Sequence, residues 1–398
     1  MMRKLDLNDI ECVHETDMSK KLTIDGITET YQIYKIKLDC LYYNNQNGRI
    51  ATWISKYESE NGPLDLQNSK YNDTIHEMIV ESNEEAFKKT KNNIRLYGQR
   101  ESGVVLKDGR IVDGNRRFTC LRELSQEDAK FGYFEAVILD RSYDDGKKAI
   151  KSLELTLQHG TDKPVDYDPI NKLVDVYNYL IKDGHEFTPK EFAKNIDQPE
   201  SEVKKSMEVA KLMIEYLEFI NAPEQFHLVF KQNIYGPLVD MRTRLKKIQD
   251  EELRETLKQS MFCAILYGKG DLTRNMRRYN KILESEVSPE FINQQNQIID
   301  KVTEKIGNIS EPMTQSIISE QILNDKDLEN EIESTIRIEF DKSTANAAKS
   351  APLALLDSAI AKLQAIDSTS MAIVTKRKDL EEKIETLSNE INRIKKCL

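Results

Sequence analysis

The chain has 398 residues, enough for two or three domains with more than one buried core. Hydrophobic residues make up 39% and charged residues 32% of it, and no apolar run approaches the roughly 18 residues of a membrane span, which argues against a membrane partner. The formal net charge is −10, the wrong sign for a protein that coats nucleic acid through bulk electrostatics, so any DNA contact must come from a local basic patch.

The N-terminal segment has no apolar core of a signal peptide, and the five cysteines form no CxxC pair. We therefore expect a protein of the reducing cytoplasm, without a disulfide framework or a zinc ribbon. The five histidines are dispersed and form no HExxH, so a metal held by His and Cys is not expected. A magnesium ion held by carboxylates or by a triphosphate remains open, since such ions need few protein ligands.

Residues 1–160 mix strand and helix signals and predict an α/β domain. Thr30 to Leu38 and Phe134 to Asp140 read as strands, and residues 104–112 read as a hairpin that turns at Asp108-Gly109. Residues 84–96 and 117–124 have helical spacing.

Residues 161–284 predict a helical domain. The sequence FTPKEF offers Thr188 as N-cap, Pro189 at the first helical position and Glu191 to complete a capping box, with Phe187 and Phe192 as a hydrophobic staple. Pro199 then begins a longer helix with one apolar face, so the pair is a helix-turn-helix candidate. Residues 228–281 hold twelve Lys and Arg against six Asp and Glu, which is typical either of a phosphate-binding surface or of solvated helix faces.

Residues 285–398 read as a C-terminal helical region that ends in a short coiled coil. Apolar residues recur at the 4-3 spacing of a coiled-coil seam, namely Leu380, Ile384, Leu387, Ile391, Ile394 and Leu398. Three heptads fit either a homodimer through these helices or an intramolecular helical pair. The fold class expected for the whole chain is α+β, with the α/β domain followed by all-α regions.

The segment Asp113-Gly114-Asn115-Arg116-Arg117 stands where a strand passes into a helix. Backbone N–H groups after Gly114 would point out of the helix N-terminus and form an anion site, and a bound polyphosphate would offset two arginines placed unfavourably in the first helical turn. Asp113 could order the turn or hold a magnesium ion. An ordinary turn with two solvated arginines is the alternative.

This segment resembles the phosphate-binding motif of the ParB/sulfiredoxin superfamily, whose ParB branch carries Gly-Glu-Arg-Arg and then Arg-Ala one residue later. Asn47-Gly48-Arg49 stands where that family has its Asn-Pro-to-Arg segment, and the run from Asn93 to Gln99 resembles the helix and glycine before the central hairpin. Residues 155–159 fall where ParB proteins have Glu-Asn-x-x-Arg, and the helix-turn-helix follows in the same order. The likeness covers about residues 30–220.

The resemblance implies an N-terminal ParB/sulfiredoxin-like domain that binds a nucleoside triphosphate, CTP in ParB and ATP in sulfiredoxin, with Mg²⁺, and a helix-turn-helix that binds DNA. The nucleotide-binding residues it implies are Arg49, Gly98, Gln99, Gly114, Asn115, Arg116, Arg117 and His159. The implied DNA contacts are Ser201, Lys204, Lys205 and Lys211, and the catalytic candidates are Asp113, also the metal ligand, and Glu154.

The chain departs from the ParB pattern at four positions. Thr119 replaces the third arginine, and Leu155 and Thr156 replace the carboxylate and amide associated with magnesium. His159 replaces the final arginine, while Glu154 lies one position away from the expected carboxylate.

Two other functions stay open. Asp113-Gly114-Asn115-Arg116 also resembles the Asp-Gly-Gln-Arg motif of NTPases or DNA-nicking proteins in bacterial DNA-modification and anti-phage systems, where Asp113 would be the essential carboxylate. Alternatively, the nucleotide site is vestigial and the C-terminal helices bind a partner protein.

Overall fold

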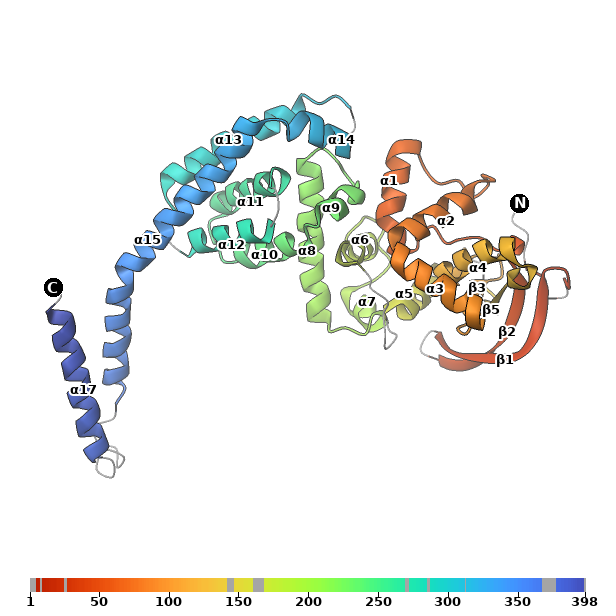
Figure 1. Ribbon diagram of the computed structural model, residues 1–398, viewed down its shortest axis with the longest axis horizontal. Coiled ribbons are helices and arrows are strands. Elements are labelled where there is room, and N and C mark those ends of the chain that lie inside the picture. The colour runs from red at the N-terminus through yellow and green to blue at the C-terminus, as the bar shows by residue number, and fades with distance from the viewer. Residues whose placement is uncertain are drawn as a thin grey trace.

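The structure of this chain is a computed structural model that describes residues 5–7, 9–24, 27–141, 147–159, 168–268, 272–284, 287–311, 313–366 and 377–396. The chain forms an elongated α+β molecule, with the sheet at one end and helices along the rest (Figure 1). The α+β fold class expected from the sequence is thus confirmed.

A five-stranded mixed sheet forms the N-terminal end, in the order β1-β2-β5-β3-β4. Only β3 and β5 run parallel within it, and the other neighbours pair antiparallel. The strands are β1 (Val13–Ile24), β2 (Ile27–Lys37), β3 (Gly103–Leu106), β4 (Ile111–Asp113) and β5 (Tyr133–Leu139). The predicted strand at 30–38, the hairpin at 104–112 and the strand at 134–140 are therefore confirmed, whereas β1 has no counterpart in the sequence analysis.

Helices cover both faces of this sheet. One face of the sheet packs against the helices at residues 51–97, before the β3–β4 hairpin, and at residues 115–127, after it. The opposite face packs against Leu153, from the helix at residues 147–159. The elements of this end are η1 (Leu38–Cys40), η2 (Gly48–Ile50), α1 (Ala51–Asn61), α2 (Tyr71–Ser82), α3 (Glu84–Tyr97), α4 (Asn115–Glu127), η3 (Ala129–Phe131) and α5 (Lys147–His159). The predicted helices at 84–96 and 117–124 correspond to α3 and α4.

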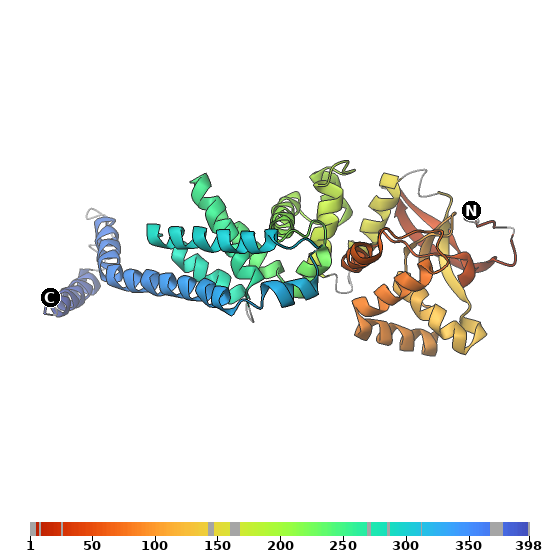
Figure 2. The same cartoon turned by 90° about the horizontal axis from the view of Figure 1, so that it is seen from above.

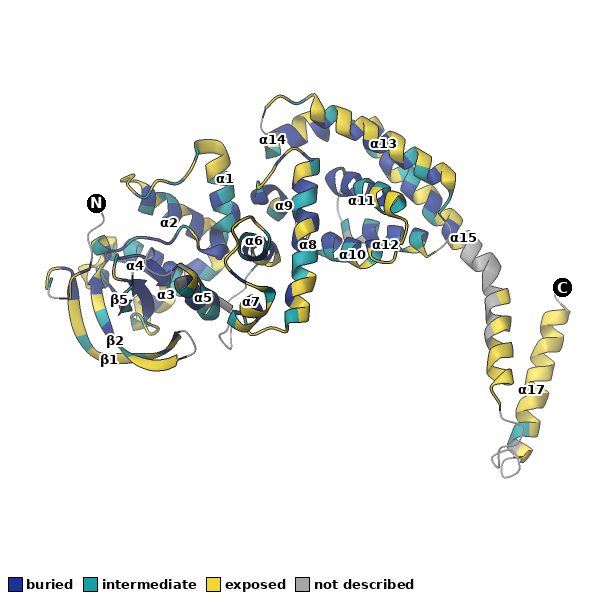
Figure 3. Cartoon of the chain, turned by 180° about the vertical axis from the view of Figure 1, so that it is seen from behind, coloured by how far each residue is buried: buried dark blue, intermediate teal, exposed yellow. Residues whose placement is uncertain are grey.

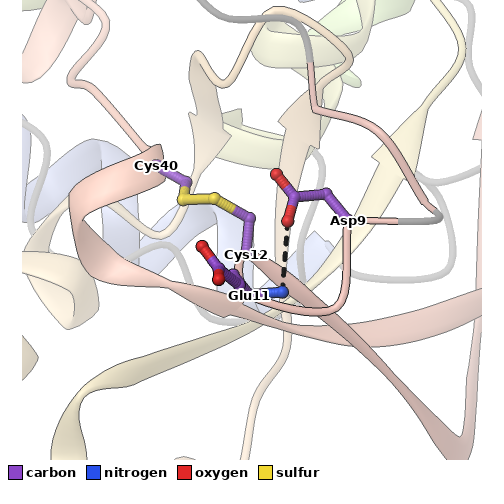
Figure 4. The surroundings of a disulfide bond; sticks show 4 residues. All are labelled: Asp9, Glu11, Cys12 and Cys40. Carbon is purple, nitrogen blue, oxygen red and sulfur yellow. Dashed lines mark hydrogen bonds between the residues drawn. A yellow bond between two sulfur atoms is a disulfide. The ribbon is translucent and has the colours of Figure 1, made fainter.

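A disulfide joins Cys12, just before β1, to Cys40 at the end of η1 (Figure 4). The scattered cysteines were expected to form no disulfide framework, and this pair corrects that expectation. The two cysteines are 28 residues apart, and only the β1–β2 hairpin brings them together. Among the other described cysteines, Cys120 and Cys263 are buried and free.

The helical part begins with α6 (Pro169–Leu180), and the predicted helix-turn-helix, α7 and α8, follows it. Thr188 and Glu191 form both bonds of the capping box of α7, and the rings of Phe187 and Phe192 pack edge to face with centroids 6.4 Å apart. After the turn at 196–199, the longer helix buries Val203, Ala210 and Leu217 on one face. The helices are α6 (Pro169–Leu180), α7 (Pro189–Asn195), α8 (Glu200–Phe219), α9 (Phe226–Gln232), α10 (Tyr235–Leu245), α11 (Glu251–Leu266) and α12 (Leu272–Leu283).

One hydrophobic core runs from Leu155 to Ile336 and so joins α6–α12 to the helices that follow. These are α13 (Pro289–Gly307), the short α14 (Gln315–Ile317), the π-helical turn η5 (Ile318–Ile322) and the long α15 (Lys326–Gln364). Figure 2 shows α15 running past the helical part and on beyond it. The division predicted at residues 160 and 284 stays a prediction.

The last helix, α17 (Arg377–Lys395), lies at the far end of the molecule. Its described side chains, which do not include Asp379, are exposed apart from the half-buried Leu380, as the yellow ribbon in Figure 3 shows. Within the described part of the chain, no helix combines the length and the apolar character needed to cross a bilayer.

Candidate functional site

The polypeptide turns sharply from β4 into α4 at Gly114. Its backbone is left-handed, with φ 103° and ψ 17°, and a Cβ added there would lie 2.8 Å from Cζ of Phe134. Only glycine fits this conformation and this contact without strain. No side chain caps α4, so the first N–H groups of the helix, which have no intrahelical acceptor, are free to meet a ligand.

A cavity of about 610 Å³ opens beside this helix start. Its volume lies within the range of about 300 to 1,000 Å³ that is usual for small-molecule sites. The walls come from four segments: the loop at 47–50, the end of α2 with the inner face of α3, the turn at 98–101, and residues 112–117.

Basic side chains outnumber acidic ones around this cavity. Arg116 packs near Arg49 and Arg117, and its pKa is lowered, chiefly by burial and then by the positive charge of Arg49. Because guanidinium groups stay protonated in proteins, their mutual repulsion is relieved best by a bound anion. The lining cations are Arg49, Lys89, Arg100, Arg116 and Arg117, against Glu85, Glu101 and Asp113.

Asp113 is engaged by one of these cations. Its Oδ2 accepts a hydrogen bond of 2.8 Å from Nη2 of Arg117, four residues along the chain. This internal carboxylate balances one guanidinium, whereas Arg49 and Arg116 form no ion pair with an acidic side chain among the described residues. Asp113 thus pairs with a guanidinium that a bound anion would otherwise engage.

Three buried polar atoms at the cavity lack a hydrogen-bond partner within the described part of the chain. They are Nε of Arg49, Nε of Arg117 and Oδ1 of Asn115, a residue only 6% exposed. Buried polar groups are nearly always satisfied in native proteins, so such a cluster indicates a missing ligand or missing water. The cavity wall therefore offers unused donors and one unused acceptor side by side.

Thr119, which replaces the third arginine of the ParB motif, belongs to the core. It is fully buried, its hydroxyl lies 2.9 Å from the hydroxyl of Tyr43, and it donates to the Asn115 carbonyl oxygen at 2.8 Å. An arginine at this position would place an uncompensated charge in the core. Thr119 thus belongs to the core and not to the cavity wall.

The structure brings together most of the expected nucleotide-binding residues. Those lining the cavity are Arg49, Gly98, Gly114, Asn115, Arg116 and Arg117. Asp113, the catalytic and metal candidate, lines it as well. Gln99 lies outside the lining and exchanges hydrogen bonds with the backbone of Glu135, so it ties the end of α3 to β5. The side chain of His159 lies outside the described residues.

Glu154 also lies away from this cavity. It is 3% exposed, and its Oε2 accepts hydrogen bonds from Nδ2 of Asn44 at 3.1 Å and from Nζ of Lys151 at 2.9 Å. Burial raises its pKa, although the Lys151 ammonium opposes that shift. Lys151 in turn lines a second cavity of about 680 Å³ between the loop at 45–48, α1, α6 and the turn before α9.

Sequence reasoning missed two of the cations, Lys89 on α3 and Arg100 after it. The available signal was the position of Lys89 and Asn93 four residues apart, which places both on one face of α3 and toward the cavity. Arg100 lies against the ring of Tyr97 at 4.4 Å, and nothing in the sequence predicts that contact.

The helix-turn-helix presents a mixed surface. Ser201, Lys204, Lys205 and Lys211 are all exposed on α8. Lys204 pairs with Glu200 at 2.7 Å, Lys205 pairs with Glu202, and Glu208 pairs with Arg242 of the basic segment. Carboxylates therefore neutralise part of the surface that was expected to contact DNA.

No three His, Cys, Asp or Glu side chains gather as a metal site in the part of the chain that the structure describes. A magnesium ion here would need most of its ligands from a bound polyphosphate and from water. The carboxylates on the cavity wall are Asp113, Glu85 and Glu101.

Comparison with known proteins adds little to these observations. No protein-family model matches the chain, and no curated protein matches it. One solved structure, described as the C2221 form of a Pnob8-like ParB-N domain, is similar over 70% of this chain and 99% of its own, with 13% sequence identity and a TM-score of 0.33. A TM-score this low does not establish a shared fold or a shared function.

Proposed function

We propose that this chain is a ParB-like protein that binds a nucleoside triphosphate in the cavity beside Gly114. The observation that carries the proposal is the cluster of Arg49, Arg116 and Arg117 next to the uncapped start of α4. Backbone amides at a helix N-terminus and guanidinium groups are the two donors that proteins most often use for phosphate. The motif resemblance in the sequence points to the same residues.

The two ends of the nucleotide would meet different walls. Phosphates would lie against the α4 amides, Arg116 and Arg49, while the base and ribose would lie toward α3 and the unpartnered Oδ1 of Asn115. Asp113 would hold Mg²⁺, which neutralises phosphate charge when bound. CTP and ATP are both candidates, since an amide side chain can pair with the amino group of either base.

We further propose that the nucleotide controls DNA binding by a cytoplasmic homodimer. Ser201 and Lys211 are exposed on α8, and DNA phosphates would displace Glu200 and Glu202 from Lys204 and Lys205. Exposed pairs of this kind contribute little stability, about 0 to 1 kcal/mol, so exchanging them for phosphate contacts is feasible. The apolar seam of α17 supplies a surface for a second copy.

The first prediction concerns Arg116 and Arg117. Titration calorimetry with each of the four nucleoside triphosphates and Mg²⁺ should detect binding to the unchanged chain and none to Arg116→Ala/Arg117→Ala. A ligand at 100 times its dissociation constant should also raise the unfolding free energy by about 2.7 kcal/mol. Absence of binding at millimolar nucleotide, or equal binding by both proteins, would contradict the proposal.

A second candidate is an NTPase or a DNA-nicking enzyme of a DNA-modification or anti-phage system. The supporting observation is that the Asp113 carboxylate lines the same cavity as the arginines. This alternative predicts phosphate release or plasmid nicking that disappears in Asp113→Asn. A pure binding protein should instead bind Mg²⁺-free polyphosphate more tightly in Asp113→Asn, because the substitution frees Arg117 from its internal partner.

A further inference from the structure

A buried polar cluster lies between α5, α6 and the loop that carries Arg49. Its members are each at most 3% exposed: Asn44, Lys151, Glu154 and Asn171. None of them lines the cavity beside Gly114. They therefore do not contact the proposed ligand. Their burial against the loop that carries Arg49 needs another explanation.

The cluster holds the loop at its start. Glu154 accepts from Nδ2 of Asn44 at 3.1 Å and from Nζ of Lys151 at 2.9 Å. The same Lys151 ammonium donates to the carbonyl oxygen of Gln46 at 3.1 Å, and it lies 5.0 Å from the ring centre of Tyr179. One ion pair on α5 thus fixes two points of the loop.

A second contact holds the loop at its end. Nδ2 of Asn171, on α6, donates to the carbonyl oxygen of Arg49 itself at 3.1 Å. The side chain of Arg49 lines the cavity, so α6 fixes the backbone from which this guanidinium reaches the ligand. Because α6 also packs on α8, the loop is connected to the helix-turn-helix through one helix.

Stability alone does not explain an ion pair in this place. A buried pair gains little over well-packed apolar residues because both charges lose their hydration. Here the pair also makes hydrogen bonds to Asn44 and to the Gln46 carbonyl oxygen, and these bonds hold the loop in one position. We propose that Lys151, Glu154 and Asn171 are positioning residues that hold Arg49 toward the ligand. They couple nucleotide binding to α5 and α6, and this inference rests on the proposed function.

The test is a thermodynamic cycle with Arg49. Lys151→Met/Glu154→Met should weaken binding of ATP or CTP with Mg²⁺ by about tenfold, a usual size for coupling between sites. Arg49→Ala should weaken it as much, and the triple variant should bind no worse than Arg49→Ala. Losses that add in the triple variant, or an unchanged affinity in the double variant, would overturn the inference.

A second readout needs no nucleotide. Hydrogen exchange of the backbone amides at 45–50 should accelerate by about tenfold in the double variant, because the loop loses two of its anchors. If the double variant does not fold, Asn171→Leu removes only the anchor at Arg49, and it should weaken binding in the Arg49 background but not in Arg49→Ala. Unchanged exchange in the double variant would count against the inference.

The matched control is Gln295→Leu. Gln295 is fully buried in a polar cluster with Ser260 and Tyr279, whose hydroxyls lie 2.7 Å apart, in the helical part. Its replacement should leave nucleotide affinity and loop exchange unchanged. If the unchanged chain binds no nucleotide, the proposed function and this inference fall together; if it binds and the double variant binds equally well, only the inference falls.

Discussion

Gly114 combines a left-handed backbone with a close contact, and both features can be tested by one methyl group. In Gly114→Ala, the new Cβ would lie 2.8 Å from Phe134 and 3.0 Å from Nη2 of Arg117 at a φ of 103°. We expect the unfolding free energy to fall by about 2 to 3 kcal/mol, from backbone strain and overpacking together. Nucleotide binding should be lost because the α4 amides and Arg117 must move. Urea unfolding and calorimetry measure the two effects.

Gly62 provides the matched control for this substitution. It has a similar backbone, with φ 81°, but an added Cβ would meet nothing within 4 Å, and it lies outside the cavity. Gly62→Ala should therefore lower stability by about 1 to 2 kcal/mol, from strain alone. Equal nucleotide affinity of Gly114→Ala and Gly62→Ala would argue against a ligand at the start of α4.

The sequence alone predicted some residues of the site but not the contacts of others. Gly114, Arg116 and Arg117 follow from local chemistry, because a glycine between a strand and a helix and two arginines in the first turn are visible in the sequence. Glu154 could not be placed in this way, since its partner Asn44 is 110 residues away and meets it only in the folded chain. The Cys12–Cys40 pair could not be predicted for the same reason, because its two residues meet only in the folded chain.

Elements with a clear period or a clear cap were predicted well. The capping box of α7 is local and appears in the structure as expected. Strand β1 was missed because it pairs only with β2 and most of its residues are exposed, so polar residues such as Asp17, Lys20 and Lys21 interrupt the apolar alternation. Edge strands that carry charges in this way are protected against pairing with other chains.

Helix α9 carries a histidine that makes its packing sensitive to acid. His227 is 8% exposed, and burial lowers its pKa from 6.5 to about 4, with a smaller contribution from Lys231. The folded state therefore favours the neutral ring. This stability is fully present above pH 6.5 and is lost as the pH falls toward 4, about 3 kcal/mol in all. Urea unfolding across this range should show the loss.

Replacement of His227 separates this effect from other titrations. In His227→Gln, the part of the pH dependence that belongs to this ring should disappear, while His185→Gln, at an exposed position after α6, should keep it. Since α9 packs on α1, acid should first weaken the contact between the helical part and the helices beside the sheet. A curve for His227→Gln that parallels the unchanged chain would contradict this explanation.

At the scale of the whole molecule, the apolar seam of α17 is uncovered. Ile384 is 62%, Leu387 39% and Ile391 41% exposed, although their spacing is that of a coiled coil. If a second copy covers them, Ile384→Asp/Ile391→Asp should convert a dimer into a monomer, because each charge would be buried in the seam. Light scattering coupled to gel filtration measures the mass directly.

The outer face of the same helix supplies the control. Asn389→Asp adds one charge opposite the seam and should leave the mass unchanged. A monomer in the unchanged chain at tens of micromolar would instead favour an intramolecular partner for α17. The sequence could not decide between these two, because three heptads carry the same pattern in either arrangement.

The Cys12–Cys40 disulfide makes the stability of the protein depend on the redox conditions of the preparation. Closing a 28-residue loop restricts the unfolded chain and stabilises the fold by about 3 to 4 kcal/mol on the loop-entropy estimate. A preparation exposed to air and one kept in a strong reductant would therefore differ in melting temperature. The reduced protein would be heavier by only two hydrogen atoms. Cys40 lies four residues before Asn44, so the choice of buffer during purification would already alter the segment that leads to Arg49.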